Sequence, residues 1–441
     1  MSGTRMQRSI GCLLALHLGS TAVWALDDPA RETFLDRVGA LLTVVAREHV
    51  DPPPQRDLLA AGVRRMAGDL DPELSRWSER IPHAGAAAER ERFLLGLHDA
   101  ALAHADAQEV VRSMLRGILA RLPGDAYTVD ADTARVNDSL DGNRYVGVGV
   151  VLGLQDGRPQ VLDTYFGGPA HRGGIEPGDV VYGVDGHDTH GMSMARFLEY
   201  SRDEVGTELT YVVGRPGSAE RRAVRMLRAV VPRETVTGTE RGADERWAYR
   251  LPSSPLAYVA VSEINASTAH ELRQAAERIR RDGLRGVVLD LRRCDARSAH
   301  AAALVADLFL TEGLLGASET RRARTAYPAG PDALFDPSRV AVLVDGTTAG
   351  TAEWLAAVLR RGGATLVGGT TAGEPYLYGR VTVPGWELEL SLATGWMLAP
   401  GGDGAPPTEP MGRVRPDRFV RDAERVVDVA RELLAPLRSS F

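Results

Sequence analysis

The 441-residue chain contains no lysine, because all 52 of its basic residues other than histidine are arginines. Any mechanism that needs a lysine amine is therefore excluded. The chain has only two cysteines and ten scattered histidines, without the spacing typical of a metal site. We therefore expect no metal and no other cofactor.

The sequence also lacks the net positive charge that would attract nucleic acid or an anionic membrane surface. Its formal net charge is -7 at pH 7, so nucleic acid is not expected as a partner. Hydrophobic residues make up 44% and charged residues 25% of the chain. This ordinary composition excludes wholesale disorder and collagen-like repeats. The length predicts two or three domains.

A targeting segment is expected at the start of the chain. Arg5 and Arg8 precede an apolar run at residues 10–24, and a signal peptidase would cut after Ala25. The run is short and interrupted for a transmembrane helix, although a retained anchor stays an alternative. After cleavage Cys294 would be the only cysteine, so no internal disulfide could form. The sequence thus predicts an exported, periplasmic protein.

Hydrophobic periodicity divides the chain that follows a signal peptide at residues 1–25 into three regions. Residues 27–140 are predicted to be mainly helical, with stops at proline-containing turns. Residues 141–229 change to a period of two, which predicts a small β-barrel with a short helix. Residues 230–441 alternate strands and helices, which predicts an α/β core with partly parallel strands. The expected fold class is multidomain α/β.

Several stretches of the chain resemble the C-terminal processing peptidases, also called tail-specific proteases. They are HVDP at residues 49–52 with DLDP at 69–72, YVGVGV at 145–150 with GPAHRGGIEPGD at 168–179, VVLDLR at 287–292, and GRVRPD at 412–417. The resemblance covers nearly the whole mature chain. It implies that the three regions are a helical N-terminal region, a PDZ domain and a peptidase-like α/β core.

The resemblance also implies a site that has lost its chemistry. The family uses a serine at the start of a helix, activated by a neutral lysine, and a glycine-rich oxyanion loop. Here TAGTAE at residues 348–353 places Gly350 at the serine position, and GGTTAGE at residues 368–374 places Glu374 at the lysine position. The oxyanion loop reads RCDAR at residues 293–297. Arginine cannot act as the base, because it stays protonated, so no catalytic residue is expected.

Two kinds of substitute nucleophile remain open. Cys294 lies in the loop that would border the site, and a thiolate needs less activation than a hydroxyl. The alternative interpretation of Cys294 is a small buried side chain at a strand end. A shift of the alignment by one or two residues would instead offer Thr348 or Thr351, while His300 is expected on a helix surface. Such a substitute would make the protein an active endopeptidase; the favoured interpretation is a pseudopeptidase.

The PDZ resemblance implies that the protein binds peptides. A PDZ domain adds an extended peptide as a strand and holds its terminal carboxylate with backbone N–H groups. The residues expected to bind the peptide are Tyr145, Val146, Gly147, Val148, Gly149 and Phe197, with Met194 and Leu198 beside Phe197. For Phe197, packing into the domain core is an equal alternative. The expected partners are protein C-termini or unfolded protein tails, and a homo-oligomer or an adaptor partner is left open. The function implied is that of a scaffold, adaptor or regulator.

Overall fold

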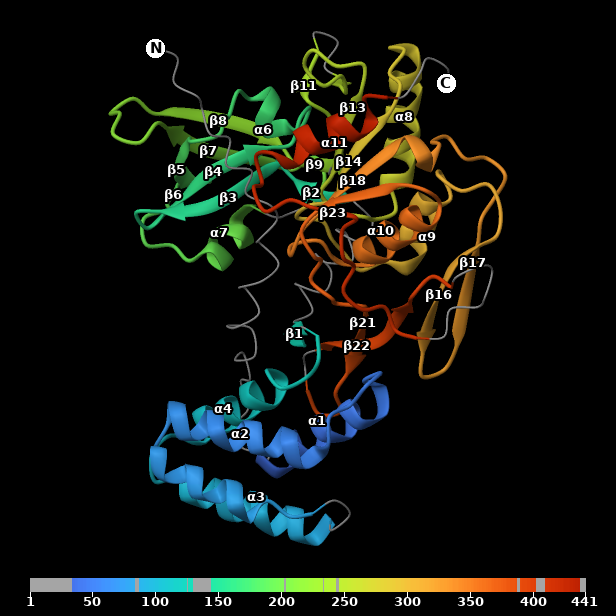
Figure 1. Ribbon diagram of the computed structural model, residues 1–441. Coiled ribbons are helices and arrows are strands. Elements are labelled where there is room, and N and C mark those ends of the chain that lie inside the picture. Colours follow the sequence, from blue (N-terminus) through green and yellow to red (C-terminus); the bar gives the residue numbers. More distant parts are fainter. Residues whose placement is uncertain are drawn as a thin grey trace. The chain divides into compact units, whose positions relative to one another are not determined.

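The computed structural model describes residues 34–83, 87–124, 126–129, 144–201, 204–232, 234–242, 246–386, 389–401 and 409–436 (Figure 1). The predicted targeting segment lies outside these residues. The chain divides into two compact units, a larger one of Met1–Ala134 and Val236–Phe441 and a smaller one of Arg135–Thr235. Among the described helices, none has the length and apolar character needed to cross a membrane.

The larger unit begins with a group of helices. They are α1 (Phe34–Glu48), α2 (Gln55–Asp69), the 3₁₀-helix η3 (Pro72–Arg80), α3 (Ala87–Ala101) and α4 (Ala107–Leu119). Apolar side chains at helical spacing in α1 are buried, and prolines separate α1 from α2. The Asp106 carboxylate caps α4 by accepting the N–H of Glu109 at 2.9 Å. The sequence does not predict α3, because its alanine-rich start gives no clear apolar period.

A five-stranded sheet packs against these helices. Its strands are β1 (Tyr127–Val129), β16 (Leu314–Thr320), β17 (Arg324–Pro328), β21 (Tyr376–Thr382) and β22 (Glu389–Leu398). Val383, Leu390 and Leu392 share one hydrophobic cluster with the buried residues of the helices. Strand β1 lies inside the range predicted to be mainly helical, because its pairing with β22 overrides the local preference of the chain.

The core of the larger unit is a six-stranded sheet. Its order is β10 (Val236–Thr237), β13 (Ala257–Val261), β14 (Val287–Asp290), β18 (Val340–Val344), β20 (Thr365–Gly368) and β23 (Arg418–Phe419), and only the β10 pairing is antiparallel. Helices α8 (Thr268–Arg281), α9 (Ala299–Ala306) and α10 (Thr351–Arg361) cover one face and α11 (Val426–Leu434) covers the other (Figure 1). In β18, Val342 faces the first cluster and Leu343 the second. Burial on both faces explains the continuous apolar runs of these strands, and the predicted α/β core is confirmed.

Short elements complete the larger unit. They are β11 (Glu240–Arg241), which pairs with β12 (Trp247–Ala248), β15 (Asp295–Ala296), which pairs in parallel with β19 (Ala349–Gly350), and the 3₁₀-helix η4 (Pro337–Arg339). Strand β15 follows β14, and β19 follows β18. The β15–β19 pair therefore joins two loops at the carboxyl ends of the central strands.

The smaller unit consists mainly of β-strands. Its sheet has the order β3 (Val150–Gln155), β4 (Arg158–Thr164), β5 (Val180–Val184), β7 (Glu208–Gly214) and β8 (Arg222–Leu227), with β6 (His187–Asp188) beside β5. Strand β2 (Arg144–Gly147) pairs separately with β9 (Ala229–Pro232), and the helices are α6 (Pro169–Arg172) and α7 (Met194–Ser201). Leu209, Tyr211 and Val213 alternate with less buried residues along β7. This alternation is the period of two seen in the sequence.

Candidate functional site

The candidate site lies where three loops follow the carboxyl ends of β14, β18 and β20. The N–H of Ala349 donates to the carbonyl oxygen of Cys294 at 3.0 Å, which joins the first loop to the second. The N–H of Ala372 donates to the carbonyl oxygen of Thr348 at 3.1 Å, which joins the third loop to the second. Ligand sites of parallel sheets lie at this edge. The structure thus brings together the loops that carry the candidate catalytic residues.

Gly350 occupies the turn from β19 into α10 and is the N-cap residue of that helix. Its backbone has φ of 63° and ψ of -132°, a conformation that residues with a side chain rarely adopt. A strained turn from a strand into a helix is the position from which α/β-hydrolases present their nucleophilic serine. Gly350 keeps such a turn and is buried, but it has no side chain. The position offers no nucleophile.

The two threonines beside Gly350 differ in their contacts. The Thr348 hydroxyl donates to the carbonyl oxygen of Leu291 at 3.0 Å and accepts the N–H of Asp345 at 3.1 Å. Both bonds hold the loop between β18 and α10, which is a structural role. The Thr351 side chain is also buried, and its hydroxyl has no hydrogen-bond partner within the described part of the chain.

Cys294 is fully buried and belongs to the hydrophobic cluster of the core. The residue before it, Arg293, has φ of 64°, and its N–H donates to the hydroxyl of Thr347 at 2.9 Å. Cys294 therefore has the surroundings of a small buried side chain at a strand end, one of the two interpretations that the sequence allows. His300 is exposed on α9, as expected for a residue on a helix surface.

Glu353 is a buried carboxylate that sequence reasoning missed. One of its oxygens accepts the N–H of Gly373 at 2.7 Å, and the other accepts the N–H of Glu374 at 2.8 Å. Glu353 lies in the first turn of α10, where the helix dipole favours negative charge. Glu374 is exposed, and the site fixes the backbone of this residue. The sequence signal that could have indicated this buried carboxylate is an acidic residue at the start of an otherwise apolar helix.

A second buried carboxylate, Asp290, fixes the end of β14. It accepts the hydroxyl of Tyr258 at 2.7 Å and pairs with the Arg292 guanidinium at 2.6 Å. Burial raises the pKa of Tyr258, and the negative charge of Asp290 raises it further. The hydrogen bonds to Asp290 raise the pKa of Arg292. Arg292 also donates to the carbonyl oxygen of Ala423 at 3.1 Å, which attaches the strand end to the segment before α11.

The segment after α1 approaches the loop that carries Glu374. Burial raises the pKa of Tyr376, and the negative charges of Asp51 and Glu374 add to this shift. Close by, His49 is fully buried, with Nε2 at 3.1 Å from the carbonyl oxygen of Pro123 and Nδ1 accepting the N–H of Asp51 at 3.0 Å. These bonds require the neutral imidazole with its proton on Nε2, and burial lowers the pKa of His49.

In the smaller unit, the loop predicted to hold a peptide carboxylate is partly a strand. Tyr145, Val146 and Gly147 belong to β2 and pair with β9. Strand pairing fixes the backbone of these three residues, and that they bind a peptide stays a prediction. Val148 and Gly149 follow β2, and their carbonyl oxygens accept backbone N–H groups at 2.7 and 3.0 Å.

Phe197 on α7 packs into the core of the smaller unit. Its side chain is fully buried, and its ring centroid lies 5.4 Å from that of Tyr211. The sequence allows Phe197 to line a peptide pocket or to pack into the domain core, and in the structure it packs into the core. Leu198, its neighbour, is half-buried.

Strand β3 offers an edge that the sequence analysis did not single out. It is the terminal strand of its sheet, and one of its edges has no partner strand among the described residues. Leu154 in β3 is 60% exposed. On α7, Tyr200 stacks on His187 of β6, so the flank of the helix that carries Met194 and Leu198 is turned away from β6. An edge strand with apolar neighbours is the arrangement that accepts an extended peptide as an added strand.

Comparison with known proteins supports the resemblance. Residues 255–410 match the model of peptidase family S41. The chain is 26% identical to the carboxy-terminal processing protease CtpB of Bacillus subtilis over 42% of this chain and 38% of that protein. It is 24% identical to a carboxy-terminal-processing protease of Bartonella bacilliformis over 67% of each. The solved photosystem II D1 C-terminal processing protease aligns with 92% of this chain and 100% of its own, at 21% identity and a TM-score of 0.43. The match thus spans 38% of the length of the Bacillus protein and 67% of the length of the Bartonella protein.

Proposed function

We propose that the protein is an exported, periplasmic pseudopeptidase, from the premise that residues 255–410 match the model of peptidase family S41. It binds protein C-termini or unstructured tails as a scaffold, adaptor or regulator and does not hydrolyse them. The observation that carries the proposal is Gly350, a glycine at the turn where a nucleophile would stand, in a chain without lysine. The exposed carboxylate of Glu374 is no replacement, because without strong desolvation it is a weak base for a hydroxyl.

We assign the binding of tails to the smaller unit as a PDZ domain. An extended peptide pairs with the free edge of β3, and its last side chain lies against Met194 and Leu198. Backbone N–H groups near Val148 and Gly149 receive the terminal carboxylate, which needs no charged side chain. The half-buried state of Leu198 supports an apolar pocket for the last residue of the tail.

The first experiment separates binding from cleavage. The mature protein is incubated with unstructured proteins that differ in their C-termini, and capture and cleavage are both measured. We expect capture without cleavage, and no cleavage by the Gly350→Ser variant either, because the hydroxyl would still lack a base. Cleavage by the unmodified protein that disappears in Cys294→Ala or Thr351→Val would overturn the proposal.

The second experiment tests the peptide groove by calorimetry with a tail peptide and its C-terminal amide. A charge-assisted hydrogen bond is worth roughly 1.5–3 kcal/mol, so amidation should weaken binding about tenfold or more. Leu198→Gln should also weaken binding. Leu227→Gln is the matched control, because Leu227 is 59% exposed on β8 at the other end of the sheet. Equal affinities for acid and amide would mean that the edge does not recognise C-termini.

A second candidate function is peptide hydrolysis with a threonine nucleophile near Gly350. It rests on the buried hydroxyl of Thr351, which has no hydrogen-bond partner within the described residues. Thr348 is less suited, because both hydrogen bonds of its hydroxyl hold the backbone. The cleavage assay with Thr351→Val decides between the two functions.

A further inference from the structure

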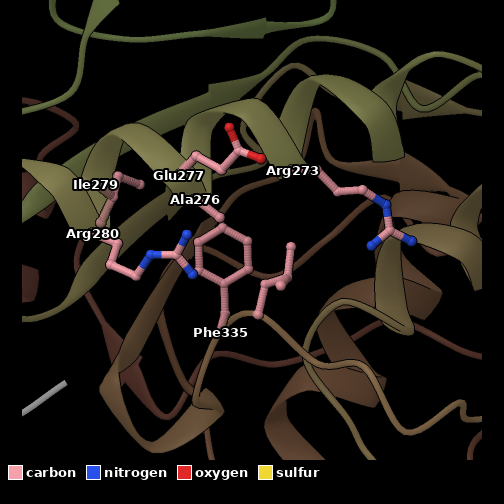
Figure 2. A pocket seen from close by; sticks show the side chains of 7 residues that line it. Arg273, Ala276, Glu277, Ile279, Arg280 and Phe335 are labelled. Carbon is pink, nitrogen blue, oxygen red and sulfur yellow. The ribbon is translucent and has the colours of Figure 1, made fainter.

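A pocket of about 220 Å³ lies between the outer face of α8 and the segment before η4. Figure 2 shows its lining side chains. Apolar atoms of Ala276, Ile279 and Phe335 form its floor, and charged side chains of α8 form its rim. None of these residues belongs to the loops around Gly350 or to the smaller unit.

The floor of the pocket is apolar and fixed in place. Phe335 is 5% exposed, and its ring stacks on that of Phe309 with centroids 4.8 Å apart and planes inclined by 19°. The N–H groups of Leu334 and Phe335 both donate to the carbonyl oxygen of Leu308, at 2.7 and 3.0 Å. The Phe335 ring is therefore held from behind, and only a small part of it lies at the surface of the pocket.

The rim carries two arginines and one glutamate. Arg273, Glu277 and Arg280 follow each other at spacings of four and three residues, which places them on one face of α8. The two arginines are about 10 Å apart along the helix axis. Among the described residues, no ion pair or hydrogen bond engages the side chains of these three, whereas the neighbouring Arg278 pairs with Asp282 at 3.4 Å. Figure 2 shows the Glu277 carboxylate turned away from Arg280.

We propose that this pocket binds a carboxylate carried on a single aromatic ring. The ring packs on Leu334, which is 37% exposed, above the buried floor of the pocket. The carboxylate pairs with the guanidinium of Arg280, whose charge has no anionic partner in the described structure. A volume below that of drug-sized ligand sites suits one ring. Two sources share this chemistry, a small free aromatic acid and an aromatic residue at the C-terminus of a peptide. The proposal does not depend on the function assigned to the smaller unit.

The test uses the full chain and ligand-observed NMR titrations. The probes are 3-phenylpropionate, its uncharged amide, and an N-acetylated peptide that ends in phenylalanine. We expect saturable binding of the acid, and binding of the amide that is about two- to fivefold weaker because it loses an ion pair that is exposed to solvent. Tighter binding of the peptide than of the free acid would identify a chain terminus as the natural source, and the reverse order a small molecule. Equal affinities of acid and amide, or no saturable binding of either charged probe, would overturn the proposal.

Substitutions in the same helix locate the binding. Arg280→Gln should weaken binding of both charged probes about two- to fivefold. Arg281→Gln is the matched control, because it removes the same charge from the same exposed turn without lining the pocket. Ala276→Leu should fill the pocket and abolish binding of the free acid. The same loss in Arg280→Gln and Arg281→Gln would show that only the general charge of the helix attracts the probes, and would contradict the proposed site. For the peptide, the measured quantity is the change in affinity caused by Arg280→Gln, because binding of the peptide to the smaller unit is the same in both proteins.

Discussion

The buried carboxylate of Glu353 should be one of the most sensitive positions of the larger unit. Its two oxygens accept consecutive N–H groups at 2.7 and 2.8 Å, and its side chain has no exposed surface. Hydrogen bonds to a charged group contribute more than those between neutral groups, and a buried donor left without an acceptor costs further free energy. Replacement of Glu353 should therefore destabilise the loop of residues 369–375 and, through it, the fold.

The size of the effect follows from the number of bonds lost. Glu353→Gln keeps one oxygen as an acceptor but turns an NH₂ group toward the other backbone N–H, so one bond is lost and one donor is unsatisfied. This should cost about 2–4 kcal/mol. Glu353→Ala leaves both donors unsatisfied and opens a cavity, which should cost about 4–6 kcal/mol. Either cost is a large part of the roughly 5–15 kcal/mol that stabilises a typical domain.

The assay combines urea unfolding with hydrogen exchange. Unfolding followed by circular dichroism gives the loss of stability, and exchange of the Gly373 and Glu374 amides reports on the two bonds directly. Glu432→Gln, an exposed glutamate on α11, is the control and should change neither quantity. Unchanged exchange at residues 373 and 374 in Glu353→Ala, with a loss below about 0.5 kcal/mol, would refute this account of the loop.

Three further predictions concern stability. Gly350→Ala should cost about 1–2 kcal/mol in urea unfolding because Gly350 has φ of 63°, whereas Gly39→Ala, in open space on α1, should not destabilise. Burial lowers the pKa of His49 below its usual 6.5, so the unfolded chain takes up a proton on this residue before the folded chain does as the pH falls. The free energy of unfolding should therefore decrease from about pH 6.5 downward. His49→Phe should flatten this pH dependence in thermal unfolding. Arg321 donates to the carbonyl oxygens of residues 46 and 47 at the end of α1. Arg321→Ala should lower the free energy of unfolding by about 1 kcal/mol and speed amide exchange at the end of α1. Arg324 is exposed on β17, and Arg324→Ala should change neither quantity.

The sequence predicts the central elements of the larger unit because local signals and tertiary packing agree there. The apolar runs of β14 and β18 are buried on both faces, and the helical spacing of α1 matches its buried stripe. The five-stranded sheet could not be predicted in the same way. Strand β1 has three residues and exists through its pairing with β22, a partner more than 250 positions later in the chain. Such a strand carries almost no local signal.

In the candidate site, too, the sequence predicts some features and leaves others undetermined. The resemblance to the peptidases was enough to place Gly350, Cys294 and Thr348 in neighbouring loops, because these loops follow parallel strands. It could not assign contacts. The hydroxyl of Thr348 donates one hydrogen bond to the backbone and accepts another from it. The carboxylate of Glu353 accepts the backbone N–H groups of Gly373 and Glu374. Both contacts depend on the spacing of two loops, a quantity that no single segment of the sequence encodes.

The residues that shape this site differ from those that would react in it. Thr348 and Glu353 hold the second and third loops through buried hydrogen bonds, and neither needs a nucleophile or a base to do so. Gly350 adopts its positive φ without the strain that a residue with a side chain would bear. The turn therefore does not depend on a nucleophilic side chain at this position. This separation of the frame from the reactive groups is what the proposed pseudopeptidase requires.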